Sequence, residues 1–346
     1  MGQLVNMKRT DVNQLGEFGL IDHLTRDYRL TQKSTIKGIG DDAAVIDYGK
    51  FQTVISTDML VEHIHFDMVY TPLKHLGYKA VVVNLSDIYA MNATPMQITL
   101  SLAISNRYSV EALEEFYKGV YLACEKYNVD LIGGDTTSST KGLVISVTAI
   151  GRGVPEKLTY RNKAKVGDII CVSGDLGAAY LGLQILEREK QIYLENPDIR
   201  PDLEKQDYLV GRLLKPEARG DMIDYFAKAE LVPTSMMDIS DGLASEVFHI
   251  CSQSNVGAFI EEGNVPIHPD TEAQAIKFKF DPITCALSGG EDYELLFTIN
   301  PNDLEKVKYM PNVSIIGEIV DRSEGITLHT TGGNIHPLQA QGWNHF

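Results

Sequence analysis

Six short stretches of this chain share one pattern, in which acidic residues stand among Gly, Ser or Thr at or near the end of an apolar run. Any one of them could be an ordinary turn or helix cap, because Asp and Gly commonly serve both. Six in one chain are hard to explain as six turns, and we expect the fold to gather these carboxylates around shared cations and phosphate. The stretches are "GIGDDAAV", "ISTDML", "NLSDIY", "IGGDTT", "DISDG" and "SGGEDYEL".

Asp87 is the strongest single indication of such a site. It lies within residues 73–92, where apolar residues recur at helical spacing. An unpaired charge on a buried helix face is costly, so Asp87 needs a partner, and a shared metal ion is the simplest one. Hard cations such as Mg²⁺ prefer oxygen ligands. The glycines in these stretches would let the backbone approach a phosphate closely.

Composition excludes several other classes of protein. The 346 residues carry a formal net charge of −16, which argues against sequence-independent nucleic-acid binding. No window approaches 18 apolar residues, so we expect no membrane span and a cytoplasmic location. The cysteines form no Cys-x-x-Cys pair, which favours buried free thiols over a zinc or redox site. They are Cys124, Cys171, Cys251 and Cys285.

Strand-like and helix-like segments are mixed throughout the chain, which predicts an α/β (α+β) fold. The stretch 151–167 is rich in Gly, Pro and Lys and indicates a boundary between two domains, 1–155 and 156–346. A polar connection is expected within 191–210. Strands are predicted at 51–57, 96–104 and 168–174, and helices at 73–92, at 109–127 with Ser109 as the N-cap, and from Leu243.

The common nucleotide-binding signatures are absent from the chain. There is no G-x-x-x-x-G-K-[ST], no H-R-D with D-F-G, and no G-x-G-x-x-G spacing in "GIGDD". A nucleotide would therefore have to be bound in another way.

A histidine pair, one arginine and the tryptophan each have two interpretations. His63 and His65 could form a zinc pair, although contact with a substrate phosphate or its neighbour is favoured because no third soft ligand stands nearby. Arg161 is either a solvated charge of the linker or a phosphate clamp, and the residues alone favour the solvated role. Trp343, near the C-terminus, is either loose or a stacking surface for a flat heteroaromatic ligand.

The ordered set of motifs resembles the thiamine-monophosphate kinase family, which belongs to the aminoimidazole-ribonucleotide synthetase superfamily. The resemblance runs from residues 16–21 to the last residue. It implies ATP-dependent phosphorylation of thiamine monophosphate to thiamine diphosphate. It also implies a homodimer whose N-terminal domains pair into a β-barrel-like core with active sites at the interface, beside C-terminal α/β domains. The motifs are "GIGDDAAV", "STDMLVEHIHF", "NLSDIYAMNATP", "LIGGDTT", "MDISDGL", "LSGGEDYELLFT" and "GWNHF".

The resemblance also implies roles for individual residues, carried over by matching position. No covalent intermediate is implied, and metal-assisted catalysis is assigned to Asp87, Asp135 and Asp238. Contacts to ATP are implied for Gly134, Asp135, Arg161 and Ser240. Contacts to the substrate are implied for His65, Glu291, Asp292 and Trp343. Several Mg²⁺ ions per site are implied, with ligands from Asp41, Ser56, Thr57, Asp58, Asp87, Asp135, Asp238 and Asp241.

Three alternatives remain open from the sequence. The first is another ATP-dependent enzyme of the superfamily; selenophosphate synthesis is disfavoured because it would need a reactive cysteine near the N-terminus, and the first cysteine is Cys124. The second is a catalytically silent protein that binds Mg²⁺ and nucleotide. The third is a metal-dependent phosphohydrolase, which would release phosphate without an acceptor.

Overall fold

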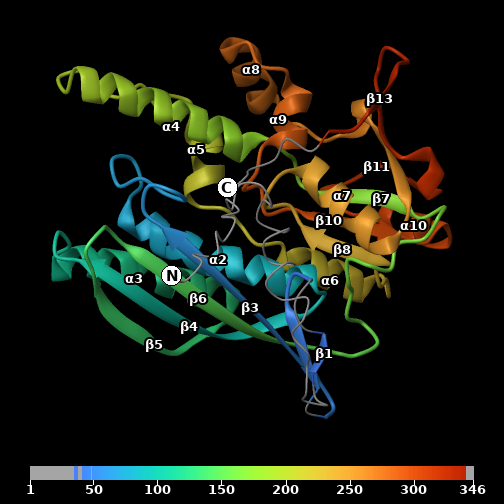
Figure 1. Cartoon of the computed structure of the whole chain (residues 1–346), viewed down its shortest axis with the longest axis horizontal. Helices are drawn as coiled ribbons and strands as arrows, with labels where there is room; N and C mark the ends of the chain where they lie inside the picture. Colours follow the sequence, from blue (N-terminus) through green and yellow to red (C-terminus); the bar gives the residue numbers. More distant parts are fainter. Residues whose placement is uncertain (1–34, 38–40, 48, 340–346) are drawn as a thin grey trace, which may run out of the picture.

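The strands of the protein form two separate sheets, and most of the helices pack against them (Figure 1). This computed structural model describes residues 35–37, 41–47 and 49–339. The strand order is β1-β2-β3-β6-β4-β5 in the first sheet and β13-β12-β9-β11-β7-β10-β8 in the second. The predicted mixture of α and β structure is confirmed. Within the described part of one chain the first sheet ends at β1 and β5, so it is not a closed barrel.

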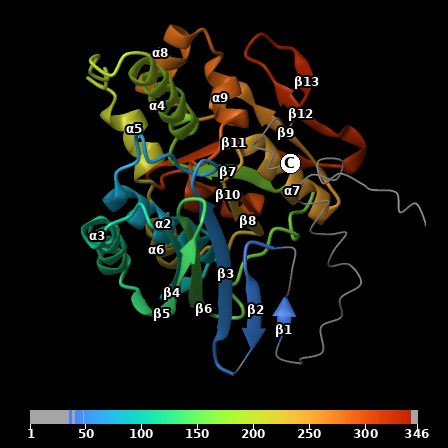
Figure 2. The same cartoon turned by 60° about the vertical axis from the view of Figure 1, so that its left-hand side comes forward.

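The first sheet has one covered face. Alternate residues of β6, such as Ile145, Val147 and Ala149, are buried towards α2, because successive side chains of a strand point to opposite faces. Helix α3 packs against α2, and its N-cap Ser109 accepts a hydrogen bond from the Ala112 amide, as predicted. Figure 2 shows both helices on the same side of this sheet. The elements are β1 (Thr35–Lys37), β2 (Ala44–Asp47), β3 (Gln52–Val61), α2 (Leu73–Ala90), β4 (Thr94–Ser105), α3 (Val110–Tyr127), β5 (Asp130–Ser139) and β6 (Val144–Gly153).

Helix α2 is the central element of the molecule. Its apolar residues occupy nearly every side, and a helix of this kind is stable only when it is covered all round. It contacts β3, β4 and β6 of the first sheet and also β8, α5 and α6, which follow in the second half of the chain. Asp87 lies in its last turn, so the predicted helix carries this carboxylate to the junction of the two halves.

The second sheet is covered on both faces. In its central strands β7 and β10, alternate residues enter two different cores: Val172 packs with α7, whereas Cys171 packs with α6. The strand at 168–174 and the helix from Leu243 are confirmed. The elements are β7 (Ile169–Ser173), α4 (Ala178–Glu195), α5 (Asp207–Leu214), α6 (Gly220–Lys228), β8 (Ser235–Asp238), α7 (Leu243–Ser254), β9 (Gly257–Glu261), α8 (Pro269–Phe278), α9 (Pro282–Ser288), β10 (Leu295–Ile299), α10 (Leu304–Val307), β11 (Val313–Val320), β12 (Ile326–His329) and β13 (Ile335–Pro337).

The polar connection expected within 191–210 lies between the end of α4 at Glu195 and the start of α5 at Asp207. Among the described helices, none combines the length and the apolar character needed to cross a bilayer.

Candidate active site

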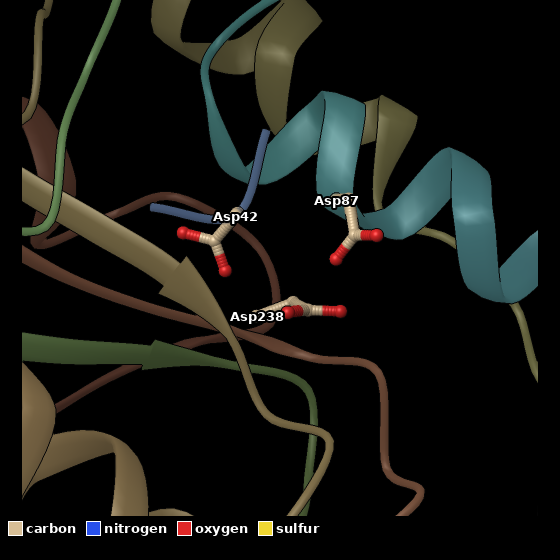
Figure 3. A group of neighbouring side chains, drawn as sticks. All are labelled: Asp42, Asp87 and Asp238. Carbon is tan, nitrogen blue, oxygen red and sulfur yellow. The ribbon is translucent and has the colours of Figure 1, made fainter. Parts of the chain in front are cut away.

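Three aspartates from distant parts of the chain meet at the junction of the two sheets. Asp42 comes just before β2, Asp87 lies in α2, and Asp238 is the last residue of β8. Each offers a carboxylate oxygen within 4.8 Å of the oxygens offered by the other two. Figure 3 shows the three carboxylates around a common space. We call this group the aspartate cluster.

The electrostatics of the aspartate cluster favour the binding of positive charge. Desolvation is the main cause that raises the pKa of Asp42 to about 7, against the opposing charge of Arg161. Desolvation also raises the pKa of Asp238 to about 6, although a hydrogen bond from Ser86 opposes the shift. The pKa of Asp87 is raised well above its usual range by desolvation and then by the charge of Asp58. Carboxylates in this situation take up a proton or a cation.

The donor set fits a hard divalent cation. All three ligand atoms are carboxylate oxygens, and among the described residues no comparable group includes a histidine or a cysteine. Mg²⁺ is bound by such oxygens together with water and substrate phosphates. The zinc interpretation of His63 and His65 therefore gains no support from the described residues.

Side chains of α2 and β3 hold these carboxylates in place. The Ser56 hydroxyl donates to Asp87 Oδ2 at 2.5 Å, and the Ser86 hydroxyl donates to Asp238 Oδ2 at 2.6 Å. Nothing in the sequence singled out Ser86. Its place one residue before Asp87 was the available signal, but helical periodicity turns it about 100° away from Asp87, towards a different partner.

Arg161 is buried against the pair of aspartates in "GIGDD". Its Nη2 lies 2.6 Å from Asp42 Oδ1, and its Nε lies 3.4 Å from Asp41 Oδ1. Arg161 is only 7% exposed, so the interpretation of this residue as a solvated linker charge is wrong. Asp41 also pairs with Lys37 Nζ at 3.4 Å. The structure thus brings Asp42, and not the expected Asp41, into the aspartate cluster.

A cavity of about 720 Å³ opens beside the cluster. Part of its wall comes from α4, which supplies Tyr180 and Leu183, and these apolar side chains suit an aromatic ligand. The described residues therefore combine a cation-binding edge with an apolar wall. The site residues expected from the sequence that line this cavity are Asp58, His65, Asp87, Asp238, Ser240, Asp241 and Glu291.

Helix α2 contributes a second charged residue that the sequence did not single out. Lys79, Val83 and Asp87 all line the cavity, because positions four residues apart share one face of a helix. Lys79 is 4% exposed and forms an ion pair with Glu291 from the opposite half of the chain. Its place eight residues before Asp87 in an apolar helix was a signal of the same kind as that of Asp87.

Two loops meet at the edge of the cavity, and their glycines allow the close approach. Glu291 N donates to Ser240 O at 2.7 Å. A Cβ atom on Gly290 would lie 2.4 Å from Ser240 O. Gly242 has φ +112°, and a Cβ atom there would lie 2.9 Å from Leu287 O. The glycine of "DISDG" is therefore required for this backbone path, and the path carries Asp238 and Asp241 to the cavity.

Four expected residues lie elsewhere in the described structure. Thr57 points to the face of β3 opposite Ser56, where it donates to Val147 O at 3.0 Å. Gly134 and Asp135 lie on the exposed edge strand β5, outside the cavity wall. Asp292 is 1% exposed.

Asp292 supports α4 and is not part of the cavity wall. Its Oδ2 accepts a hydrogen bond of 2.8 Å from the amide of Gly177, which precedes α4, and desolvation raises the pKa of Asp292 to about 7. Trp343 lies outside the described residues.

The matched family model is "AIR synthase related protein, N-terminal domain", which covers residues 40–153. The thiamine-monophosphate kinase of Buchnera aphidicola subsp. Schizaphis graminum is 36% identical over 340 residues, covering 96% of this chain and 99% of the relative. That of Aquifex aeolicus is 35% identical, covering 97% of this chain and 99% of its own length.

The fold comparison agrees with the sequence comparison. The solved structure of AaThiL complexed with AMPPCP and TMP has a TM-score of 0.82 to this chain at 33% identity, covering 98% of this chain and 99% of that one. Identity above 30% over nearly the whole length of both chains leaves one assignment: the chain belongs to the thiamine-monophosphate kinase family.

Proposed function

We propose that this chain transfers the γ-phosphoryl group of ATP to thiamine monophosphate, giving thiamine diphosphate and ADP. The observation that carries the proposal is the aspartate cluster at the edge of the cavity, in a chain whose relatives are thiamine-monophosphate kinases. Two phosphate-bearing substrates repel one another, so an enzyme of this kind needs a site for positive charge between them.

The cluster residues Asp42, Asp87 and Asp238 would hold Mg²⁺, and Asp58 and Asp241 line the same cavity. When bound, Mg²⁺ neutralises phosphate charge and orients the reacting groups. The Ser56 and Ser86 hydroxyls keep Asp87 and Asp238 in position, since each donates a short hydrogen bond to one carboxylate oxygen.

The proposed reaction is a direct in-line transfer. A phosphate oxygen of thiamine monophosphate attacks the γ-phosphorus of ATP, and the bond from the γ-phosphorus to the β–γ bridging oxygen breaks as ADP leaves. No general base is required, because a phosphate monoester is already largely ionised near neutral pH. We place the thiamine moiety in the cavity, with His65, Glu291 and the α4 wall as its contacts.

An assay of the purified chain with ATP, Mg²⁺ and thiamine monophosphate tests this function. We expect ADP and thiamine diphosphate in equal amounts, and no ADP without the acceptor. Free phosphate without an acceptor would instead indicate a phosphohydrolase. Absence of turnover with intact nucleotide binding would indicate a silent binding protein.

We further propose that residues 1–155 form a domain that pairs with the same domain of a second chain. Strand β5 is an edge of the first sheet along its ten residues, and Ile132 on it is 58% exposed. An open edge of this length is a template for pairing. Pairing there would complete a barrel-like core and would give Gly134 and Asp135 a place at an interface.

The dimer is expected to have twice the chain mass of 38.3 kDa in light scattering. Ile132→Asp is expected to shift the protein towards the monomer, because it replaces an exposed apolar side chain of the edge strand by a charge. Tyr309→Asp is the matched control, since Tyr309 is 78% exposed outside this sheet. A wild-type monomer would contradict the dimer but would leave the proposed chemistry standing.

A further inference from the structure

The loop between β8 and α7 carries two carboxylates of the site, and its backbone needs a hydrogen-bond acceptor. Asp238 and Asp241 both line the cavity, with Ile239 and Ser240 between them. The amides of Ser240 and Asp241 point to the same atom, Glu246 Oε1, at 3.2 and 2.9 Å. Both hydrogen bonds are partly buried, and backbone amides withdrawn from water need an acceptor.

Glu246 supplies this acceptor without lining the cavity itself. It lies in the first turn of α7, is 1% exposed and is not part of the cavity wall. Its second oxygen, Oε2, is buried and has no hydrogen-bond partner among the described residues. A buried carboxyl oxygen without a partner is costly, so packing alone does not account for glutamate at this position.

The opposite side of the loop is also held. Ser240 O accepts from Glu291 N at 2.7 Å, so the loop is fixed between the two residues. Among the described residues, Glu246 is the one acceptor recorded for the amides of Ser240 and Asp241. Removal of its acceptor oxygen would free both amides to turn, and the carboxylate of Asp241 would turn with them.

We propose that Glu246 is a positioning residue, which sets Asp238 and Asp241 for cation binding by accepting the amides of Ser240 and Asp241. The inference rests on the proposed function for its role in turnover, but its geometry can be tested without substrate. Replacement of a residue that orients metal ligands without binding the metal itself typically lowers metal affinity by about 10- to 100-fold.

The test is a titration of the full chain with Mn²⁺, in which the electron paramagnetic resonance signal of free Mn²⁺ measures how much is bound. We expect Glu246→Met to weaken binding by at least about tenfold. Glu246→Gln retains the acceptor Oε1 and is expected to stay within about twofold of the wild type. Glu189→Met is the matched control. Glu189 is also buried and accepts a hydrogen bond of 2.9 Å from the backbone amide of Asp202, but it is not part of the cavity wall.

The outcomes separate the inference from the proposed function. Normal Mn²⁺ affinity in a folded Glu246→Met variant would overturn the inference. So would a loss of Mn²⁺ affinity in Glu246→Gln as large as that in Glu246→Met, or a wild-type protein that binds no Mn²⁺. If Glu246→Met does not fold, Glu246→Asp replaces it, because a shorter acceptor cannot reach both amides and the same loss is expected. Wild-type Mn²⁺ binding without phosphorylation of thiamine monophosphate would instead refute the proposed function alone.

Discussion

Asp87→Asn and Asp238→Asn are each expected to lower kcat by about 1,000-fold or more at saturating Mg²⁺. Each substitution removes one negative charge from the aspartate cluster, and an interaction of unit charges at about 4 Å amounts to about 4 kcal/mol at an effective dielectric constant near 20. Each 1.36 kcal/mol corresponds to about tenfold in rate. Steady-state kinetics of ADP formation measure the effect, with the exposed Glu305→Gln on α10 as the control.

The same substitutions are expected to leave the fold intact and to raise the melting temperature of the metal-free protein at pH 8. Asn keeps an acceptor for the hydroxyls of Ser56 and Ser86, while the repulsion among like charges is reduced. A gain in stability with a loss of activity is typical of a functional site. Full activity in either variant would rule out the metal role of that aspartate.

Removal of divalent cations is expected to destabilise the protein at pH 8 and to have little effect at pH 5. The pKa values of Asp42 and Asp238 are raised to about 7 and about 6 in the folded protein, from ordinary values of 3.8. Between about 4 and 7 the folded chain therefore binds more protons than the unfolded chain. The free energy of unfolding of the metal-free protein falls as pH rises through this window.

Mg²⁺ competes with these protons, so its effect on stability has the opposite pH dependence. We expect saturating Mg²⁺ to raise the melting temperature by more than about 3 °C at pH 8 and by less than about 1 °C at pH 5. Melting curves with Mg²⁺ and with a chelator at both pH values measure this. A shift of equal size at the two pH values would show that the cation binds elsewhere.

Most of the helices and strands that build the site could be predicted from sequence, because their signals are local. The apolar spacing of 73–92 predicted α2, and Ser109 predicted the start of α3. The charge of Asp87 within an apolar helix indicated a buried partner. These signals depend on residues within one or two turns of one another, and a sequence displays them directly.

Which acidic residue of each motif reaches the site could not be predicted in the same way. Asp41 and Asp42 are neighbours and both pair with Arg161, but Asp41 also pairs with Lys37, whereas Asp42 faces the cluster. Thr57 and Ser56 are also neighbours, and the alternation of β3 sends them to opposite faces. Which face is covered by α2 depends on packing between segments far apart in the chain.

The sequence by itself determined the elements, the recurrent acidic loop motifs and the family. Only the tertiary structure decided that Asp42, Asp87 and Asp238 share one space, that Lys79 reaches Glu291, and that Glu246 supports the loop behind them. The physical reason is that propensity and periodicity act over a few residues, whereas these contacts are set by how α2 packs between the two halves of the chain.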